Sequence, residues 1–205
     1  MAATRKPGRP QGSARARLIA AADELFSRNG IAGTPVDEAV RHAGVATMTL
    51  YHHFEGKDAL VAAALRDRHE RWMRRWERHI AAASTPADRL LAIFDALEEW
   101  AQEEGAERGC AFVDAAAELS DREHPAWREI DAHKQQLRAR LVELGEAAEQ
   151  DDPDHLADQL LLLYEGALSA LLVGHVERPI ARSRELAGGL LFTSSSPPTG
   201  TTRTR

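Results

Sequence analysis

The sequence predicts an all-α protein with two parts, a small N-terminal helical domain and a larger helical body. Apolar residues recur every three or four positions in one segment after another, which is the spacing of an amphipathic helix. These segments are separated by Ser, Thr, Asp, Pro and Gly, the residues that commonly start and end helices. The apolar share of 43% in 205 residues is ordinary for a globular protein, so the chain should fold around a core.

The first two helices have clear start and stop signals. Ser13 is a suitable N-cap for a helix that ends at Asn29-Gly30. Thr34 and Pro35 then open the next helix, with Thr34 as its hydroxyl cap and Pro35 at the first helical position. Gly44 follows the last apolar residue of that helix, and glycine most easily adopts the left-handed conformation that ends a helix.

A third short helix, beginning near Thr47, has the composition of a binding surface. Leu50 and Phe54 can face inward, whereas hydroxyl, thioether, phenol and imidazole side chains are left outside. Such a helix is poor core material, but it suits a groove lined by base edges and phosphates. We expect a helix-turn-helix whose second helix presents Thr47, Met48, Thr49, Tyr51, His52 and His53.

Charge is distributed unevenly along the chain. The net charge is −6, but residues 1–60 hold eight Lys or Arg against six Asp or Glu, and the first twenty residues hold five basic residues and no acid. A basic leading end on an acidic body points to a local phosphate-binding face. We expect residues 1–12 to be a disordered basic arm, either a solvated tail or a segment that places Arg5, Lys6 and Arg9 on a DNA backbone or in its minor groove.

The remainder of the chain continues as longer helices. We expect one from Lys57 to about Ile80, where the lysine ammonium and the free N–H groups of the first turn suit a phosphate. The alternative for this lysine is an exposed side chain beside Asp58. Residues 194–205 lack core-forming side chains and should be a disordered tail. Further helices are expected to begin near Pro86, Cys110, Trp127, Pro153 and Pro179.

The helix that follows Pro153 is more apolar than a solvent-facing helix should be. We expect its cover to be the same surface of a second subunit, in a two-fold symmetric four-helix bundle. Burial within a monomer is the alternative. The expected interface residues are Leu156, Leu160, Leu163, Gly166, Ala167, Ala170 and Leu171.

A specific series of residues runs through the first third of the chain: Leu25, Phe26, Gly30, Val36, Ala39, Ala43, Gly44, Val45, Thr49, Leu50, Tyr51, His52, His53, Phe54, Lys57 and Leu60. The series resembles the N-terminal domain of the tetracycline-repressor (TetR) family of bacterial transcription regulators. Residues 108–118, RGCAFVDAAAE, resemble a segment found in the ligand-binding body of many members. Ala46 and Met48 differ from the residues that the family usually has at these positions of the DNA-contacting segment. The target DNA sequence of a relative therefore cannot be assigned to this protein.

The resemblance implies a helix-turn-helix DNA-binding domain at 13–60 and a ligand-binding and dimerisation domain at 61–193. It implies a homodimeric repressor that a small apolar or amphipathic molecule releases from a palindromic operator in double-stranded DNA. The expected DNA-binding residues are Arg5, Lys6, Arg9, Thr34, Thr47, Met48, Thr49, Tyr51, His52, His53 and Lys57. Residues expected to line a pocket, or otherwise to be core, are Trp72, Trp76, Phe94, Trp100, Cys110, Phe112, Trp127 and His133.

Several other functions find little support in the sequence. Cys110 is the only cysteine, so an intrachain disulfide and a four-cysteine zinc site are excluded and the reducing cytoplasm fits best. The apolar run from Leu160 to Val173 contains Glu165 and is too short to span a membrane. Metal-ligand spacing and nucleotide-binding glycine loops are missing, so we expect no metal, no cofactor and no enzyme. The alternatives are a nonspecific nucleoid-type DNA-binding protein and a small helical enzyme.

Overall fold

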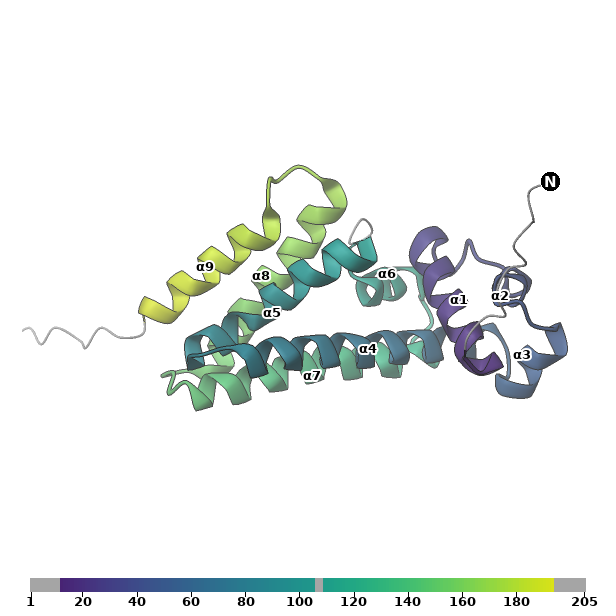
Figure 1. Cartoon of the computed structure of the whole chain (residues 1–205), viewed down its shortest axis with the longest axis horizontal. Coiled ribbons are helices and arrows are strands. Elements are labelled where there is room, and N and C mark those ends of the chain that lie inside the picture. Colours follow the sequence, from purple (N-terminus) through teal and green to yellow (C-terminus); the bar gives the residue numbers. More distant parts are fainter. Residues whose placement is uncertain (1–11, 106–108, 194–205) are drawn as a thin grey trace, which may run out of the picture. The chain divides into compact units, whose positions relative to one another are not determined.

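The computed structural model describes residues 12–105 and 109–193, and within these residues all regular structure is helical (Figure 1). The predicted all-α class is therefore confirmed. The predicted arm and tail lie outside the described residues, apart from Gly12. In chain order the helices are α1 (Ala14–Asn29), α2 (Val36–His42), α3 (Thr47–His53), α4 (Lys57–Ala82), α5 (Pro86–Trp100), the π-helical turn η1 (Ala101–Gly105), α6 (Ala111–Glu118), α7 (Ala126–Ala147), α8 (Pro153–Val173) and α9 (Pro179–Thr193).

The described chain forms two compact units that are not continuous in sequence. The first contains residues 12–72 and 111–133, and the second contains the remaining described residues. The long helices α4 and α7 each contribute their first part to one unit and their second part to the other. The functional division at residue 60 therefore stays a prediction, because the compact units follow packing and group the N-terminal helices with α6.

The first unit is built on α1, which packs against both α2 and α3. Its start is confirmed: the Ser13 hydroxyl accepts a hydrogen bond from the Ala16 N–H at 3.1 Å. Its end is confirmed at Gly30, whose φ of +79° is a conformation that glycine adopts without a steric penalty. The core around α1 is formed by Leu18, Ala22, Leu25, Ala39, Val40, Leu50, Phe54 and Leu60.

The start of α2 differs from the prediction. Pro35 is the N-cap rather than the first helical residue, and no side chain caps the helix. Thr34 is fully buried, and its hydroxyl lies 2.8 Å from the carbonyl oxygen of Gly30 and 3.3 Å from that of Leu25. The hydroxyl therefore satisfies the C-terminal end of α1 instead of the N-terminal end of α2.

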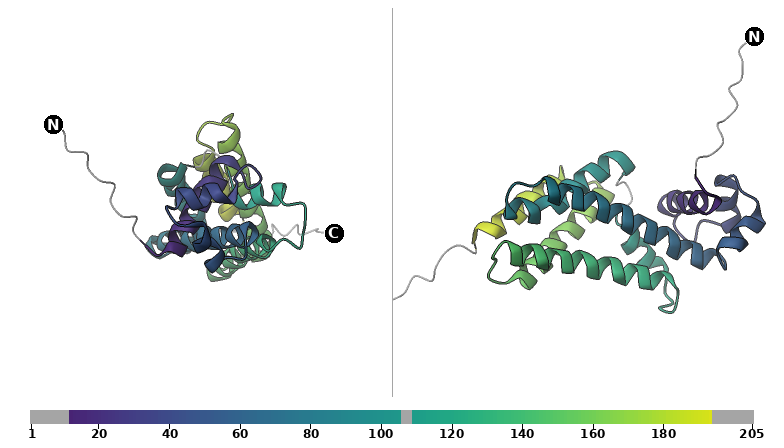
Figure 2. Two further views of the ribbon diagram at one scale, coloured as in Figure 1. Left: turned by 90° about the vertical axis from the view of Figure 1, so that its right-hand side faces the viewer. Right: turned by 60° about the horizontal axis from the view of Figure 1, so that its bottom comes forward.

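The second unit is formed by the later parts of α4 and α7 together with α5, α8 and α9. Thr85 caps α5 by accepting from the Asp88 N–H at 3.0 Å, and Asp152 caps α8 by accepting from the His155 N–H at 3.0 Å. α9 lies beside α8 and also contacts α5 (Figure 2). The largest fully buried side chains of the unit include Trp76, Phe94, Leu90, Ile93, Leu97, Leu137, Leu141 and Leu160.

α8 is longer than its apolar run suggested. It has 21 residues and a mean hydropathy of 1.5, so by length and composition alone it would suffice to cross a membrane. One face of the helix, which includes Leu156, Leu160 and Tyr164, is buried within the second unit. Its Glu165 also forms an ion pair with Lys134 of α7. This helix is therefore an element of the core of the second unit.

Glu99 on α5 gives the second unit an acid-sensitive contact with α4. Hydrogen bonds from Arg78 at 2.9 Å and from His79 at 2.5 Å lower the pKa of Glu99 from 4.5 to about 2. A carboxyl with a lowered pKa stabilises the folded state above its unfolded pKa, and this stability is lost as the pH falls through its folded pKa. We expect Glu99→Gln to flatten the decrease in the free energy of unfolding between pH 4.5 and 2, measured by urea denaturation. The exposed neighbour Glu98→Gln should leave that slope unchanged, and equal effects would argue against this contact.

Candidate nucleic-acid interface

α3 presents the surface that its sequence predicted. Leu50 and Phe54 are buried against α1, which fixes the orientation of the short helix. Met48 is 77% exposed and Tyr51 is 54% exposed, although both are large side chains with apolar parts. Thr47, His52 and His53 are exposed and Thr49 is half-exposed. This combination of donors, acceptors and apolar groups on one exposed helix is suited to reading base edges.

The turn between α2 and α3 is held from both sides. Gly44 adopts a φ of +63°, and an added Cβ there would meet no atom within 4 Å, so the backbone conformation is the reason for glycine. The Val45 N–H donates to the carbonyl oxygen of Val40 at 3.3 Å. From α1, the Arg17 Nε donates to the carbonyl oxygen of Ala43 at 3.1 Å. α1 therefore positions the turn as well as packing against both helices.

Lys57 is the first residue of α4, and its side chain is half-exposed. Among the described residues it has no ion-pair partner, whereas the neighbouring Asp58 lies 3.3 Å from the Nε2 of His124. The ammonium is thus available beside the free N–H groups at the start of α4, as a phosphate site requires. Thr34, unlike Lys57, cannot contact a phosphate, because its hydroxyl is buried. We therefore remove Thr34 from the predicted DNA contacts.

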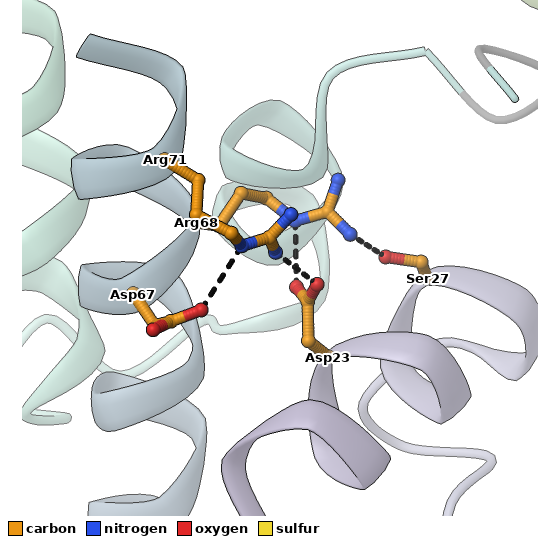
Figure 3. A network of polar contacts seen from close by, with 5 residues as sticks. All are labelled: Asp23, Ser27, Asp67, Arg68 and Arg71. Atoms are coloured by element: carbon orange, nitrogen blue, oxygen red, sulfur yellow. Dashed lines mark hydrogen bonds and ion pairs between the residues drawn. The ribbon is translucent and has the colours of Figure 1, made fainter. Parts of the chain in front are cut away.

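Asp23 of α1 joins the N-terminal helices to α4 (Figure 3). Its two carboxylate oxygens accept from the Arg68 Nε at 2.6 Å and from the Arg71 Nη2 at 2.5 Å. Arg68 also donates to the Ser27 hydroxyl at 2.5 Å, and Arg71 donates to Asp67 at 3.0 Å. Side chains from one face of α1 and one face of α4 form this network. It fixes the orientation of α1 on the start of the long helix.

Glu118, the last residue of α6, binds the loop between α1 and α2. Its carboxylate accepts from the N–H groups of Ile31 at 3.0 Å and of Ala32 at 2.7 Å. A Cβ at Gly30 would lie 2.8 Å from the carboxylate, so glycine at this position also permits the close approach. Sequence reasoning missed this contact, because its partners are 86 and 87 residues apart. The only signal in the sequence at this position was Gly30, and its role in ending α1 already explained why a glycine is there.

The predicted pocket residues have different surroundings. Trp72, Trp76, Phe94, Phe112 and His133 are buried, and Trp100, Cys110 and Trp127 are half-buried. In the first unit the Phe112 ring stacks on the His133 ring, with centroids 3.6 Å apart, and the Trp127 Nε1 donates to the carbonyl oxygen of Leu119 at 3.2 Å. In the second unit the Cys110 Sγ lies 3.5 Å from the Lys134 Nζ. Burial alone suits both core and pocket, so the pocket stays a prediction.

The predicted subunit-interface residues fall into two groups. Leu156, Leu160 and Ala167 are buried within the single chain, which removes them from an external surface. Leu163, Ala170 and Leu171 are half-buried, and Gly166 is exposed. Both faces of α8 are apolar, so the sequence did not distinguish the buried face from the exposed one, and the subunit interface stays a prediction. The exposed surface of α8 and α9 instead contains Leu162, Gly166, Ser169, Leu172, Val173, Leu186 and Gly189.

Metal-ligating side chains do not converge within the part of the chain that the structure describes, where no group of three or more His, Cys, Asp or Glu is placed to hold an ion. The expectations of no metal, no cofactor and no enzyme concern the whole chain and stay predictions.

Comparison with known proteins assigns the family. Residues 18–64 match the model of bacterial regulatory proteins of the tetR family, and residues 86–187 match the tetracyclin repressor-like C-terminal domain. The HTH-type transcriptional regulator YjdC of Escherichia coli is 27% identical over 176 residues, which cover 85% of this chain and 91% of YjdC. The HTH-type transcriptional repressor KstR2 of Mycolicibacterium smegmatis is 28% identical over 67% of this chain and 65% of its own length.

Solved structures agree with these matches. A TetR-family transcriptional regulator from Streptomyces coelicolor superposes with a TM-score of 0.81 at 29% identity, covering 89% of this chain and 96% of that chain. A second regulator, from Streptomyces avermitilis, has a TM-score of 0.68 at 30% identity and covers 86% of this chain and 98% of that chain. The chain therefore belongs to the tetR family of bacterial regulatory proteins and is a ligand-responsive, DNA-binding transcriptional regulator.

Proposed function

We propose that this protein is a cytoplasmic homodimeric repressor that a small apolar or amphipathic molecule releases from a palindromic operator. The observation that carries the proposal is the exposed face of α3, where Met48 and Tyr51 project from a helix anchored by the buried Leu50. The related KstR2 proteins are named transcriptional repressors, which favours repression over activation. A nonspecific nucleoid-type role would not need a helix whose base-facing side chains are this varied.

The proposed contacts divide into two classes. Thr47, Met48, Thr49 and His52 read base edges in the major groove, while Tyr51, His53 and Lys57 hold phosphates and set the register of the helix on the duplex. The arm residues Arg5, Lys6 and Arg9 are proposed to add contacts to the backbone or minor groove.

The proposed dimer uses the exposed apolar face of α8 and α9. Leu162, Gly166, Ser169 and Val173 recur at four-, three- and four-residue spacing, so they form one stripe along α8, and Leu186 is exposed on the neighbouring α9. An added Cβ at Gly166 would meet no atom within 4 Å, so the glycine leaves open space on that face into which a second backbone can approach. A two-fold axis through this stripe would form a four-helix bundle and present two α3 helices to half-sites about 34–36 Å apart.

Selection from random DNA tests the proposed function. The full-length protein should enrich a palindromic duplex, and the affinity for that duplex should fall steeply with salt concentration because phosphate contacts release counterions. The operator of a relative should not be used in its place, because this chain departs at Met48 from the residue that the family usually has, and Met48 is highly exposed on α3. Enrichment of no sequence, with equal binding to every duplex, would instead support the nucleoid-type alternative.

Two substitutions test the division between phosphate and base contacts. Lys57→Ala should weaken binding to all duplexes about equally and should reduce the slope of log affinity against log salt by about one unit. Thr49→Ala should change affinity by roughly 1–3 kcal/mol at particular base pairs and thereby alter the selected sequence. Quantitative binding to a panel of operator variants measures both effects. Identical affinity profiles for the two variants would contradict the assigned roles.

A further inference from the structure

Met48 places a thioether sulfur on the exposed face of α3. Its side chain is 77% exposed, the largest exposed fraction among the large apolar side chains of the described chain. Tyr51 and His52, three and four residues later, lie on the same face of the helix and are also exposed. Leu50 and Phe54 are buried and hold α3 in place from its other side. Met48 therefore contributes little to the core that fixes the helix.

The other described sulfur atoms are less accessible. Met73 on α4 is half-buried, and Cys110 is half-buried with its Sγ 3.5 Å from the Lys134 Nζ. Met1 lies outside the described residues. Thioether and thiol sulfurs are the side-chain atoms that two-electron oxidants attack, and exposure increases their susceptibility. Met48 is therefore the methionine of the described chain that such an oxidant reaches most easily.

We infer that Met48 is a site of reversible oxidation by hydrogen peroxide or a related oxygen-transfer oxidant, and that its oxidation weakens DNA binding. A lone pair of the sulfur forms a bond to one peroxide oxygen while the O–O bond breaks. The proton of the transferred oxygen passes to the departing hydroxide, so the products are methionine sulfoxide and water. The sulfur loses two electrons and the peroxide gains them. Methionine sulfoxide reductases reverse the change, with two thiols as the reductant that become a disulfide.

Oxidation changes the part of Met48 that would contact a base. An apolar side chain in the major groove can pack against the C5-methyl group of thymine. A sulfoxide is polar and chiral, and it must lose bound water to occupy the same place. The fold should not change, because a side chain with this exposure is not packed in the core. The oxidation itself is independent of the proposed function, and only its effect on DNA rests on the proposed base contact.

Duplex DNA should in turn protect Met48. In the complex the base edges would cover the side chain, so an oxidant in solution would reach the sulfur more slowly. Met73 is not among the proposed DNA contacts, and its rate of oxidation therefore serves as the internal reference for the dose of oxidant.

Peroxide treatment of the full-length protein, followed by mass spectrometry of its peptides, measures the extent and the site of oxidation. Met48 should gain one oxygen atom at least about tenfold faster than Met73. Operator DNA should slow this reaction several-fold at Met48 and not at Met73. Protein oxidised at Met48 should bind the selected operator about tenfold more weakly. Reductases for both sulfoxide epimers should restore the affinity.

Matched variants assign the effect to one sulfur. Met48→Leu keeps an apolar side chain without sulfur, so its operator affinity, whatever its starting value, should be the same before and after peroxide. Met73→Leu and Cys110→Ser should lose affinity after peroxide to the same extent as the parent protein. Met48→Gln introduces a polar group of similar length and should weaken operator binding without any oxidant.

The outcomes separate this inference from the proposed function. Oxidation of Met73 before Met48, unchanged operator affinity of protein oxidised at Met48, or an equal loss of affinity in Met48→Leu would each overturn the inference. All three leave the selection of a palindromic operator, and with it the proposed repressor, intact. Selection of no operator would contradict the proposed function, whereas preferential oxidation of Met48 with protection by any duplex would still support the modification site.

Discussion

Replacing Leu162 with glutamate should convert the proposed dimer into a monomer and lower operator affinity by roughly 100-fold or more. The Leu162 side chain is 74% exposed in the single chain, so its own folding gains little from it. A two-fold interface contains each substitution twice, and each buried leucine contributes about 1.5–3 kcal/mol. The two introduced carboxylates would also lie in an apolar interface without countercharges. Sedimentation at micromolar concentration and operator titration measure the two effects.

Ala139→Glu is the matched control for this substitution. Ala139 is exposed on α7 in the same unit, so the substitution adds the same charge away from the proposed stripe on α8 and α9. It should leave both the dimer and the operator affinity unchanged. If Leu162→Glu remained a dimer with normal operator affinity, the interface would have to lie on another surface.

Asp23→Asn should lower the free energy of unfolding by about 2–3 kcal/mol, because it leaves buried guanidinium charge on α4 without its carboxylate. The side chains of Asp23 and Arg68 are only 14% and 13% exposed, so solvent compensates little for the lost ion pairs. Arg71 retains Asp67, and Arg68 retains the Ser27 hydroxyl, which limits the loss. Urea denaturation of the full-length protein measures this difference. The slope of the free energy of unfolding against urea concentration should be the same for the variant and the parent protein.

Asp67→Asn tests whether burial is the cause. It removes a carboxylate from the same Arg71 guanidinium, but the Asp67 side chain is 42% exposed and the pair is an ordinary contact one helical turn apart. Its loss should cost about 0.3–0.5 kcal/mol. Equal destabilisation by the two variants would show that the position of Asp23 between α1 and α4 has no special importance.

Local sequence signals predicted most of the secondary structure. Ser13 and Gly30 marked the two ends of α1, and Gly44 marked the turn before α3, because capping and left-handed conformations depend on a few neighbouring residues. Thr34 was assigned to the wrong helix end, since a hydroxyl beside a helix start can also bond backward to the preceding helix. Which bond forms depends on how closely α1 and its following loop pack, and no local pattern contains that distance.

The same distinction between local sequence signals and tertiary packing applies to the proposed DNA-binding helix α3 and to the proposed interface helix α8. The exposed composition of α3 follows from the spacing of Leu50 and Phe54, so the sequence by itself determined that this helix turns polar and aromatic groups outward. The sequence was also sufficient to identify the family, because the residues of the series from Leu25 to Leu60 occur in the order typical of the family's N-terminal domain. On α8, by contrast, a buried face with Leu160 and an exposed face with Leu162 are nearly equally apolar.

Only the tertiary structure decided which face of α8 is core, that Asp23 pairs with two arginines of α4, and that Glu118 binds the loop before α2. Each of these depends on groups that lie far apart in sequence and meet only after the helices pack. Helical periodicity determines which residues share a face, whereas the partner of that face is set by packing against the rest of the chain.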